Sequence, residues 1–173
     1  TPGGYRVVEA SGRNITTFYQ PFEEDRSYVF RSYDLNECQI TAKKYAPNVT
    51  DEKLASVGAT IQEYMTANKN NEVLINIFAY DERWKLQVTE NGKELKSQRV
   101  KSYDPLALVA LTCRQLDRGQ NLTGTTTVTD TSHLFKVKAS SATSTLEIKV
   151  TDEYGNVYTE SMTRPKALTI KSR

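Results

Sequence analysis

The chain has 173 residues, a length that suits a single domain. Its 23 lysines and arginines are balanced by 21 aspartates and glutamates, which argues against the strongly basic surface of a nucleic-acid-binding protein. The longest unbroken apolar segment spans residues 106–111, whereas a membrane-spanning helix needs about 20 apolar residues. We therefore expect no nucleic-acid partner and no membrane span.

Alternating apolar and polar side chains, typical of half-buried strands, dominate the first part of the chain. Residues 5–10 and 15–20 flank a turn-like sequence at residues 11–14, so we predict a hairpin there. Two further strands are predicted at residues 28–33 and 38–43, which are rich in residues that favour pleated surfaces.

A helix is predicted to begin at Asp51, whose carboxylate can cap the first turn. Its apolar face is formed at helical spacing by Leu54, Val57, Ile61 and Tyr64 or Met65. Residues 68–71 favour turns and are expected to end it. Residues 73–80 are apolar on both faces, which predicts a central strand that is covered on both sides.

Residues 84–88 alternate cleanly and predict a strand with Trp84 on its inward face. The pair Asn91 and Gly92 follows directly, and it is the strongest short signal of a hairpin because both residues tolerate a positive φ. We expect the partner strand to continue through residues 95–100.

A second helix is predicted at residues 106–116, with Asp104 as N-cap, Pro105 at the first position and Gly119 beyond the end. Residues 121–132 are rich in threonine and form either an exposed strand or a loop. The remaining strands are predicted at residues 134–139, 146–151 and 157–162.

These elements predict a mainly β fold, an antiparallel β-sandwich or barrel-like domain with two short helices over its open ends. Strands and helices do not alternate regularly, which excludes a doubly wound parallel sheet. Because the sequence begins at Thr1 without a leader segment, we expect residues 1–173 to be one module of a longer or processed chain.

Catalytic side chains are scarce. The one histidine, His133, has only Asp130 as a nearby carboxylate in sequence, so we expect a structural residue at the start of a strand rather than a triad or metal ligand. Glycine-rich phosphate-binding loops are absent from the sequence.

The two cysteines, Cys38 and Cys113, match no metal-binding or redox pattern. They form either a disulfide in an oxidising compartment or two buried free thiols.

Acidic pairs and aromatic residues are the remaining candidates. The acidic groups lie at predicted turns and caps, where a structural role is expected; they are residues 23–25, 51–52, 81–82 and 152–153. Phe78, Tyr80 and Trp84 would suit stacking on a sugar, but Trp84 is expected in the core. Tyr80 and the loop containing Asp81 and Arg83 are the more exposed half of this group.

Several segments, in the same order along the chain, resemble one family. Residues 1–7 resemble the Asp-Gly-Thr-Pro-x-Gly-Tyr segment that begins the C-terminal domain of calcineurin-like metallophosphoesterases of the Bacteroides type. Residues 76–92 are similar to the aromatic-Asp-x-x-Trp strand and hairpin of that domain, and residues 103–107 continue the match. Residues 131–135 and 150–160 resemble its closing strands.

The resemblance implies that a preceding domain hydrolyses phosphoesters with two divalent metal ions. Its signatures, Asp-x-His, Gly-Asp-x-x-Asp, Gly-Asn-His and Gly-His-x-His, are absent here, so we assign no catalytic residue, no metal ligand and no cofactor to this chain. The chain is then a non-catalytic accessory domain, periplasmic or extracellular, that packs against the catalytic domain of the same parent chain and stabilises it. Residues 48–71 match nothing in the resemblance and are a candidate insertion.

Two other functions stay open at this point. One is a recognition module that binds a glycan or a surface partner through exposed aromatic residues, and the other is an enzyme with an unusual carboxylate site. The candidate interface or ligand-contact residues are Tyr5, Tyr80, Asp81 and Arg83. A flat apolar patch near Thr1 would favour docking, whereas a groove with an exposed aromatic floor would favour glycan binding.

Overall fold

A computed structural model describes residues 3–122 and 128–170. Residues 123–127, part of the threonine-rich stretch, lie outside the described residues. The strands are β1 Gly4–Ser11, β2 Asn14–Pro21, β3 Phe30–Asp34, β4 Glu72–Ile77, β5 Lys85–Glu90, β6 Lys93–Glu94, β7 Ser97–Ser102, β8 Thr131–Lys138, β9 Leu146–Thr151 and β10 Val157–Met162. The helices are α1 Ala42–Tyr45, α2 Asp51–Ala55, α3 Ala59–Met65 and a continuous helix of α4 Pro105–Ala107, π-helical η1 Leu108–Cys113 and α5 Arg114–Asp117.

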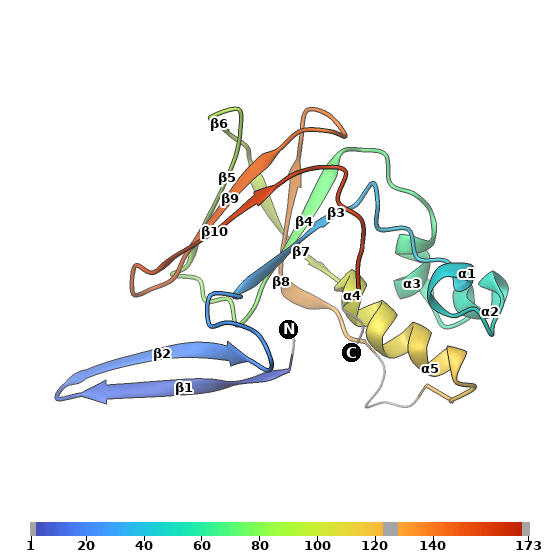
Figure 1. Ribbon diagram of the computed structural model, residues 1–173, viewed down its shortest axis with the longest axis horizontal. Coiled ribbons are helices and arrows are strands. Elements are labelled where there is room, and N and C mark those ends of the chain that lie inside the picture. Colours follow the sequence, from blue (N-terminus) through green and yellow to red (C-terminus); the bar gives the residue numbers. More distant parts are fainter. Residues whose placement is uncertain (1–2, 123–127, 171–173) are drawn as a thin grey trace.

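Two four-stranded antiparallel sheets pack against each other (Figure 1). The first has the strand order β10-β9-β5-β6, the second has the order β3-β4-β8-β7, and β1 and β2 form a separate ribbon. The predicted mainly β, antiparallel fold is therefore confirmed, and within the described residues the sheets form a sandwich without closing into a barrel.

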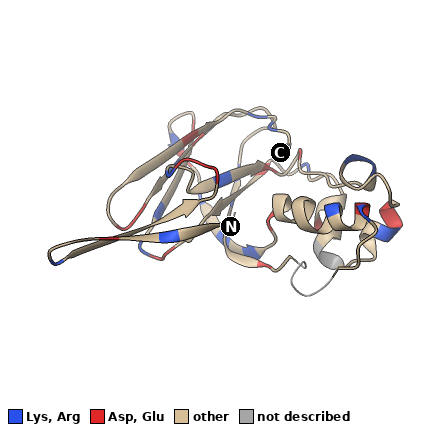
Figure 2. Ribbon diagram, turned by 60° about the horizontal axis from the view of Figure 1, so that its bottom comes forward, with Lys and Arg blue, Asp and Glu red and all other residues tan. Residues whose placement is uncertain are grey.

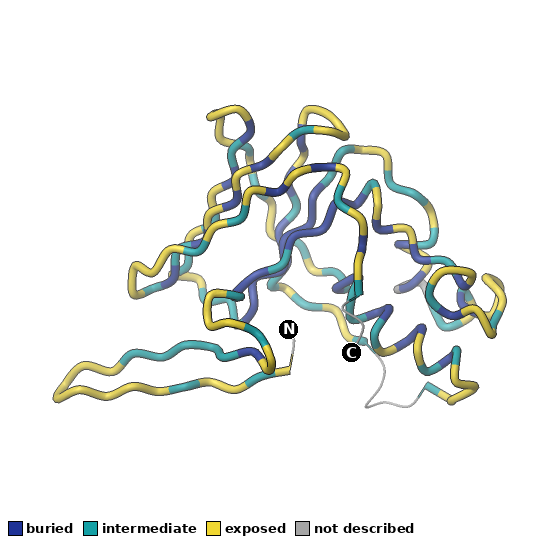
Figure 3. The backbone as a smooth tube through the Cα atoms, in the orientation of Figure 1, coloured by how far each residue is buried: buried dark blue, intermediate teal, exposed yellow. Residues whose placement is uncertain are grey.

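Apolar side chains form a core on each side of the second sheet. The inner core, between the two sheets, contains Phe30, Val73, Ile75, Ile77, Val88, Phe135, Val137, Leu146, Ile148, Val150 and Met162. The outer core, between the second sheet and the helices, contains Tyr33, Leu35, Ile40, Leu54, Ile61, Leu74, Leu108, Val109, Leu116 and Leu134. Strand β4 is buried along nearly its whole length, as its apolar sequence predicts (Figure 3).

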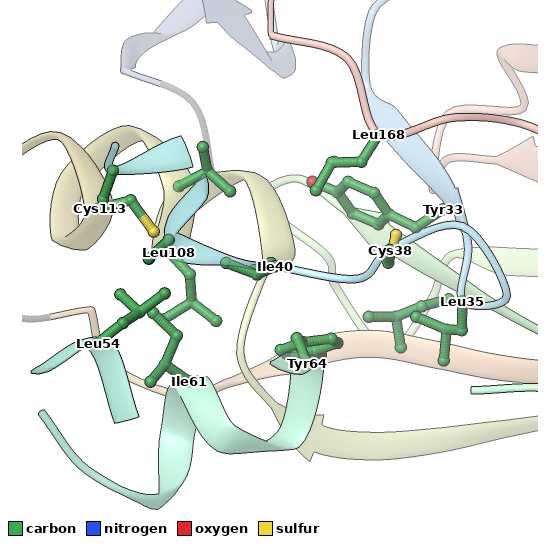
Figure 4. Close-up of a cluster of buried hydrophobic side chains, with 14 of the residues drawn as sticks. Tyr33, Leu35, Cys38, Ile40, Leu54, Ile61, Tyr64, Leu108, Cys113 and Leu168 are labelled. Carbon is green, nitrogen blue, oxygen red and sulfur yellow. The ribbon is translucent and has the colours of Figure 1, made fainter. Parts of the chain in front are cut away.

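The predicted helix at Asp51 is in fact two helices. Gly58, with φ of 126°, separates α2 from α3. The N-cap of α2 is Thr50, whose hydroxyl accepts the amide of Lys53, whereas the Asp51 carboxylate accepts the amide of Ala42 at 2.6 Å. The predicted apolar face still packs inward (Figure 4). No helix in the described segments is long and apolar enough to cross a membrane.

The strand predicted at residues 38–43 was wrong. Residues 38–41 form a loop that leads into α1, and the amide of Ile40 donates to the carbonyl of Tyr64 at the end of α3 rather than to a sheet. Cys38, Ile40 and Ala42 are all buried in the outer core. Alternate side chains of this segment do point inward, but the segment is a loop that lies on the outer core and not a strand of a sheet.

The hairpin after Asn91 is shorter than predicted. β6 returns for only two residues, and the chain then crosses to β7 in the other sheet instead of continuing one strand through residues 95–100. Trp84 precedes β5 and packs, partly buried, against the inner core. Its indole N–H donates to the carboxylate of Glu153, so its inward assignment is confirmed in part.

The β1–β2 ribbon projects from the sandwich (Figure 1). Its register, from Gly4 opposite Pro21 to Ser11 opposite Asn14, confirms the first predicted hairpin. At the base the strands lie so close that a Cβ at Gly4 would be 2.4 Å from the carbonyl oxygen of Gln20. A glycine is therefore required where the ribbon leaves the body.

The turn at Asn91 and Gly92 has φ of 51° and 77°, as the hairpin signal predicts. We expect Gly92→Val to lower the free energy of unfolding by about 1 kcal/mol or more, because a β-branched residue resists a positive φ. Asn91→Gly is the control, since glycine adopts the same conformation freely. Equal melting temperatures for Gly92→Val and the unchanged chain would contradict this account of the turn.

Candidate interaction site

His133 lies within β8, which begins before the predicted strand, and has no catalytic partner in the described part of the chain. Its Nδ1 atom is buried without a hydrogen-bond partner there. Burial, together with the positive charge of Arg99, lowers the pKa of the imidazole. Asp130, the one carboxylate that the sequence offered, pairs instead with Lys101 at 3.2 Å. These contacts favour a structural role.

One carboxylate in each acidic group accepts a backbone amide at a turn or a helix start. Asp152 accepts the amides of Tyr154 and Asn156, both at 2.9 Å, and thereby closes the β9–β10 turn. Asp25 accepts the amide of Ser27 at 2.8 Å. Among residues 3–122 and 128–170, no three His, Cys, Asp or Glu side chains are grouped as metal ligands. The residues described therefore do not fit a two-metal phosphoesterase centre.

The two cysteines are free and buried, which confirms the free-thiol alternative. Figure 4 shows Ile40 between Cys38 and Cys113. Burial raises the pKa of Cys38 to about 12 and that of Cys113 to about 11. Both thiols thus stay protonated and unreactive at neutral pH.

The predicted contact residues near β5 are largely engaged with one another. Tyr80 is half-buried, with its ring edge-on to Phe135 at 5.0 Å and the Arg99 guanidinium 4.8 Å from its centre. Arg83 donates to Asp81 at 2.7 Å, and this hydrogen bond lowers the pKa of Asp81 to about 2. The structure therefore joins Asp81 and Arg83, while one face of the Tyr80 ring is covered by Arg99.

Tyr5, the fourth predicted contact residue, lies elsewhere. Its ring is 6.0 Å from that of Phe22 at the base of the ribbon, and both side chains are more than half exposed. This pair stands at one side of a large open groove of about 1250 Å³. Sequence reasoning missed the groove.

The groove is assembled from segments that are far apart in the chain. It is lined by residues 22–28 after the ribbon, by β3, by the first part of the α4–η1–α5 helix and by residues 166–170. Gly3, the residue before β1, is also among the lining residues. Figure 2 shows that the α4 and η1 segments carry no charged residue along this wall.

The floor of the groove contains a caged arginine. The Arg31 guanidinium lies 5.4–5.9 Å from the ring centres of Tyr28, Tyr33 and Phe78. It donates to the hydroxyls of Tyr28 at 2.8 Å and Tyr33 at 2.9 Å. Burial opposes the charge, but the fields of Tyr33 and Asp104 outweigh burial and raise the pKa of Arg31.

Asp104 is the carboxylate beneath this cage. Its oxygens accept the hydroxyl of Tyr33 at 2.7 and 2.8 Å and the side-chain amide of Asn76 at 2.6 Å. The predicted N-cap is also confirmed, because the carboxylate accepts the amide of Ala107 at 2.9 Å. Burial and this carboxylate raise the pKa of Tyr33 well above its ordinary value. One side chain thus fixes β3, β4 and the helix.

The helix wall of the groove is largely apolar up to Arg114, whereas the other lining segments also carry charged side chains, among them Glu23, Asp25 and Lys166. The helix contributes Leu106, Ala107, Ala110 and Leu111, and Leu111 is 41% exposed. On the opposite side Phe22 is 57% exposed. Large apolar side chains left open on facing walls are typical of surfaces that are covered by another protein segment.

Residues 1–158 match the protein family described as the C terminal of calcineurin-like phosphoesterase. The chain belongs to this family. The match includes the candidate insertion at residues 48–71, whose helices pack into the outer core. No curated protein and no solved structure matches the chain.

We expect Asp104→Asn to destabilise the chain by about 3 kcal/mol, since it removes the buried negative charge that balances Arg31 and replaces one of two acceptor oxygens by an N–H donor. Asp81→Asn is the matched control, because it removes the carboxylate of an exposed Asp–Arg pair. Chemical denaturation of both variants tests this. A similar small effect of both substitutions would show that Asp104 does not hold the groove together.

Proposed function

We propose that this chain is a non-catalytic accessory domain that docks on the catalytic domain of a calcineurin-like phosphoesterase and stabilises it. Family membership supports the position at the C-terminal end of such an enzyme. We further propose, on the sequence resemblance, that the parent is a hydrolase with two divalent metal ions in its catalytic domain. The same resemblance supports a periplasmic or extracellular location.

The observation that carries this proposal is the groove with exposed apolar side chains, Phe22 and Leu111, on two of its sides. It is open, it is large, and Gly3, the residue before β1, is among its lining residues. A domain that precedes β1 would therefore lie beside this surface. Contacts between domains of one chain typically bury about 600–1,500 Å² and combine apolar with polar groups. The groove offers both, because the exposed Leu111 and Phe22 lie in one lining with charged side chains such as Lys166.

Glycan binding through Tyr80 has less support. Arg99 covers one face of the half-buried ring and Phe135 contacts the ring in a T-shaped arrangement, which leaves less aromatic surface for a sugar than a fully exposed ring offers. An unusual carboxylate enzyme is also less supported, because one carboxylate of each acidic pair or group is engaged in a turn or cap hydrogen bond.

The test compares the intact phosphoesterase with Phe22→Ser and Val157→Thr variants of this domain. Phe22 and Val157 are similarly exposed, at 57% and 53%, but only Phe22 lines the groove. We expect Phe22→Ser to lower the melting temperature of the intact enzyme, as deletion of the whole domain does, with turnover of an aryl phosphate per folded enzyme little changed. Val157→Thr should have almost no effect.

Unchanged stability after deletion of the domain would contradict docking. If, in addition, the chain bound a glycan and Tyr80→Ala abolished that binding, the recognition-module function would replace it. Equal effects of Phe22→Ser and Val157→Thr would show that the groove is not the docking surface.

A further inference from the structure

The β1–β2 ribbon projects from the body (Figure 1), which contacts its middle through Arg26 at Glu9 and Phe18 and through Tyr154 at Thr17. Some of its apolar side chains are nonetheless exposed. Val8 and Ile15 are 61% and 63% exposed. A two-stranded ribbon is marginally stable in water when nothing packs against it. The ribbon therefore has the composition of an element that another layer completes.

Hydrogen bonding divides the residues of β1 into two sets. At the base, the amide of Phe22 donates to the carbonyl of Gly3 at 2.9 Å, and hydrogen-bonded pairs recur at every second position from there. Arg6, Val8 and Ala10 fall in the other set, so their N–H and C=O groups point away from β2. The N–H and C=O groups of these three residues make no hydrogen bond to β2.

The two edges of the ribbon differ. On the β2 edge, the outward amide of Thr17, directly across from Val8, donates to the hydroxyl of Tyr154 at 3.1 Å. The β1 edge pairs with no strand in the described residues. It contains no proline and no bulge, the devices that commonly block an edge. The β1 edge is thus ready to accept another strand.

We infer that the free edge of β1 pairs with a strand from the preceding part of the phosphoesterase chain. Backbone hydrogen bonds to Arg6, Val8 and Ala10 extend the ribbon into a larger sheet shared by the two domains. This inference rests on the proposed docking function, and in it β1 is the element that makes the contact.

The position of Gly3 beside the groove indicates the occupant. Residues before Gly3 join β1 at its base, beside the groove, so a segment of the same chain reaches this edge through a short loop closure. A second copy of the domain is not joined to β1 by a short loop, so its pairing with this edge would cost more entropy. Arg6 and Glu9 lie on opposite faces of the ribbon. If two copies of β1 paired edge to edge, Arg6 of one copy would therefore not face Glu9 of the other, and no ion pair would favour that contact.

Hydrogen exchange in the intact phosphoesterase tests the pairing residue by residue. We expect the amides of Arg6, Val8 and Ala10 to be protected to a degree similar to that of Val7, which is already bonded within the ribbon. Rapid exchange at the three outward amides beside a protected Val7 would overturn the inference. Protection that grows with protein concentration would also overturn it, because it would indicate a second copy.

Two substitutions at one position isolate the backbone group. Val8→Pro removes the outward N–H, which β2 does not use, whereas Val8→Thr keeps it and keeps a β-branched side chain. We expect the proline variant to lower the melting temperature of the intact enzyme and the threonine variant to leave it nearly unchanged. If neither has an effect while Phe22→Ser still destabilises, docking stands and strand pairing is wrong.

Discussion

The carboxylate of Asp104 is the point on which the architecture of the groove depends. It begins the helix by accepting a backbone amide, and it accepts side-chain donors from two strands of the second sheet. It also balances the charge of Arg31, whose guanidinium lies 3.6 Å away. Because the group is buried, each of these partners would be left unsatisfied without it. The helix wall, the floor and the sheet are thus fixed relative to one another by one residue.

A second buried ion pair closes the opposite end of β3. Arg164 donates to Asp34 at 2.9 Å, and both side chains are completely buried. Lys166 continues this link, because it donates to Ser32 of β3 and to Glu160 of β10. The edge strands of the two sheets are therefore joined by the segment that also lines the groove. A rigid frame of this kind presents an apolar surface in a fixed orientation, as a docking domain requires.

The sequence was sufficient where the signal is local. Asp104 with Pro105 predicted the start of a helix, and Asn91 with Gly92 predicted a tight turn, because caps and turns depend on neighbouring residues. The β1–β2 hairpin followed from alternation around a turn-like sequence, and the buried β4 followed from residues that are apolar on both faces of the strand. The strand at residues 38–43 failed because a loop lying on a core shows the same alternation as a strand.

Much less of the candidate site could be predicted from the sequence. Tyr5 was identified, but the groove beside it was not, since its walls come from segments up to about 160 residues apart along the chain. Tyr33 and Asp104, which are 71 residues apart in sequence, carry no local sign that they meet. Periodicity shows which side of an element is buried, but it does not show which distant element covers it.

Hydroxyl-radical footprinting of the intact phosphoesterase tests the docking surface most directly. Tyr5, Phe22 and Leu111, which are 54%, 57% and 41% exposed in this domain, should be protected from oxidation. Tyr154 and Val157, which are 41% and 53% exposed and lie outside the groove lining, should keep their reactivity. Oxidation of all five residues in proportion to these exposures would show that the groove faces solvent in the whole enzyme, and would contradict the account.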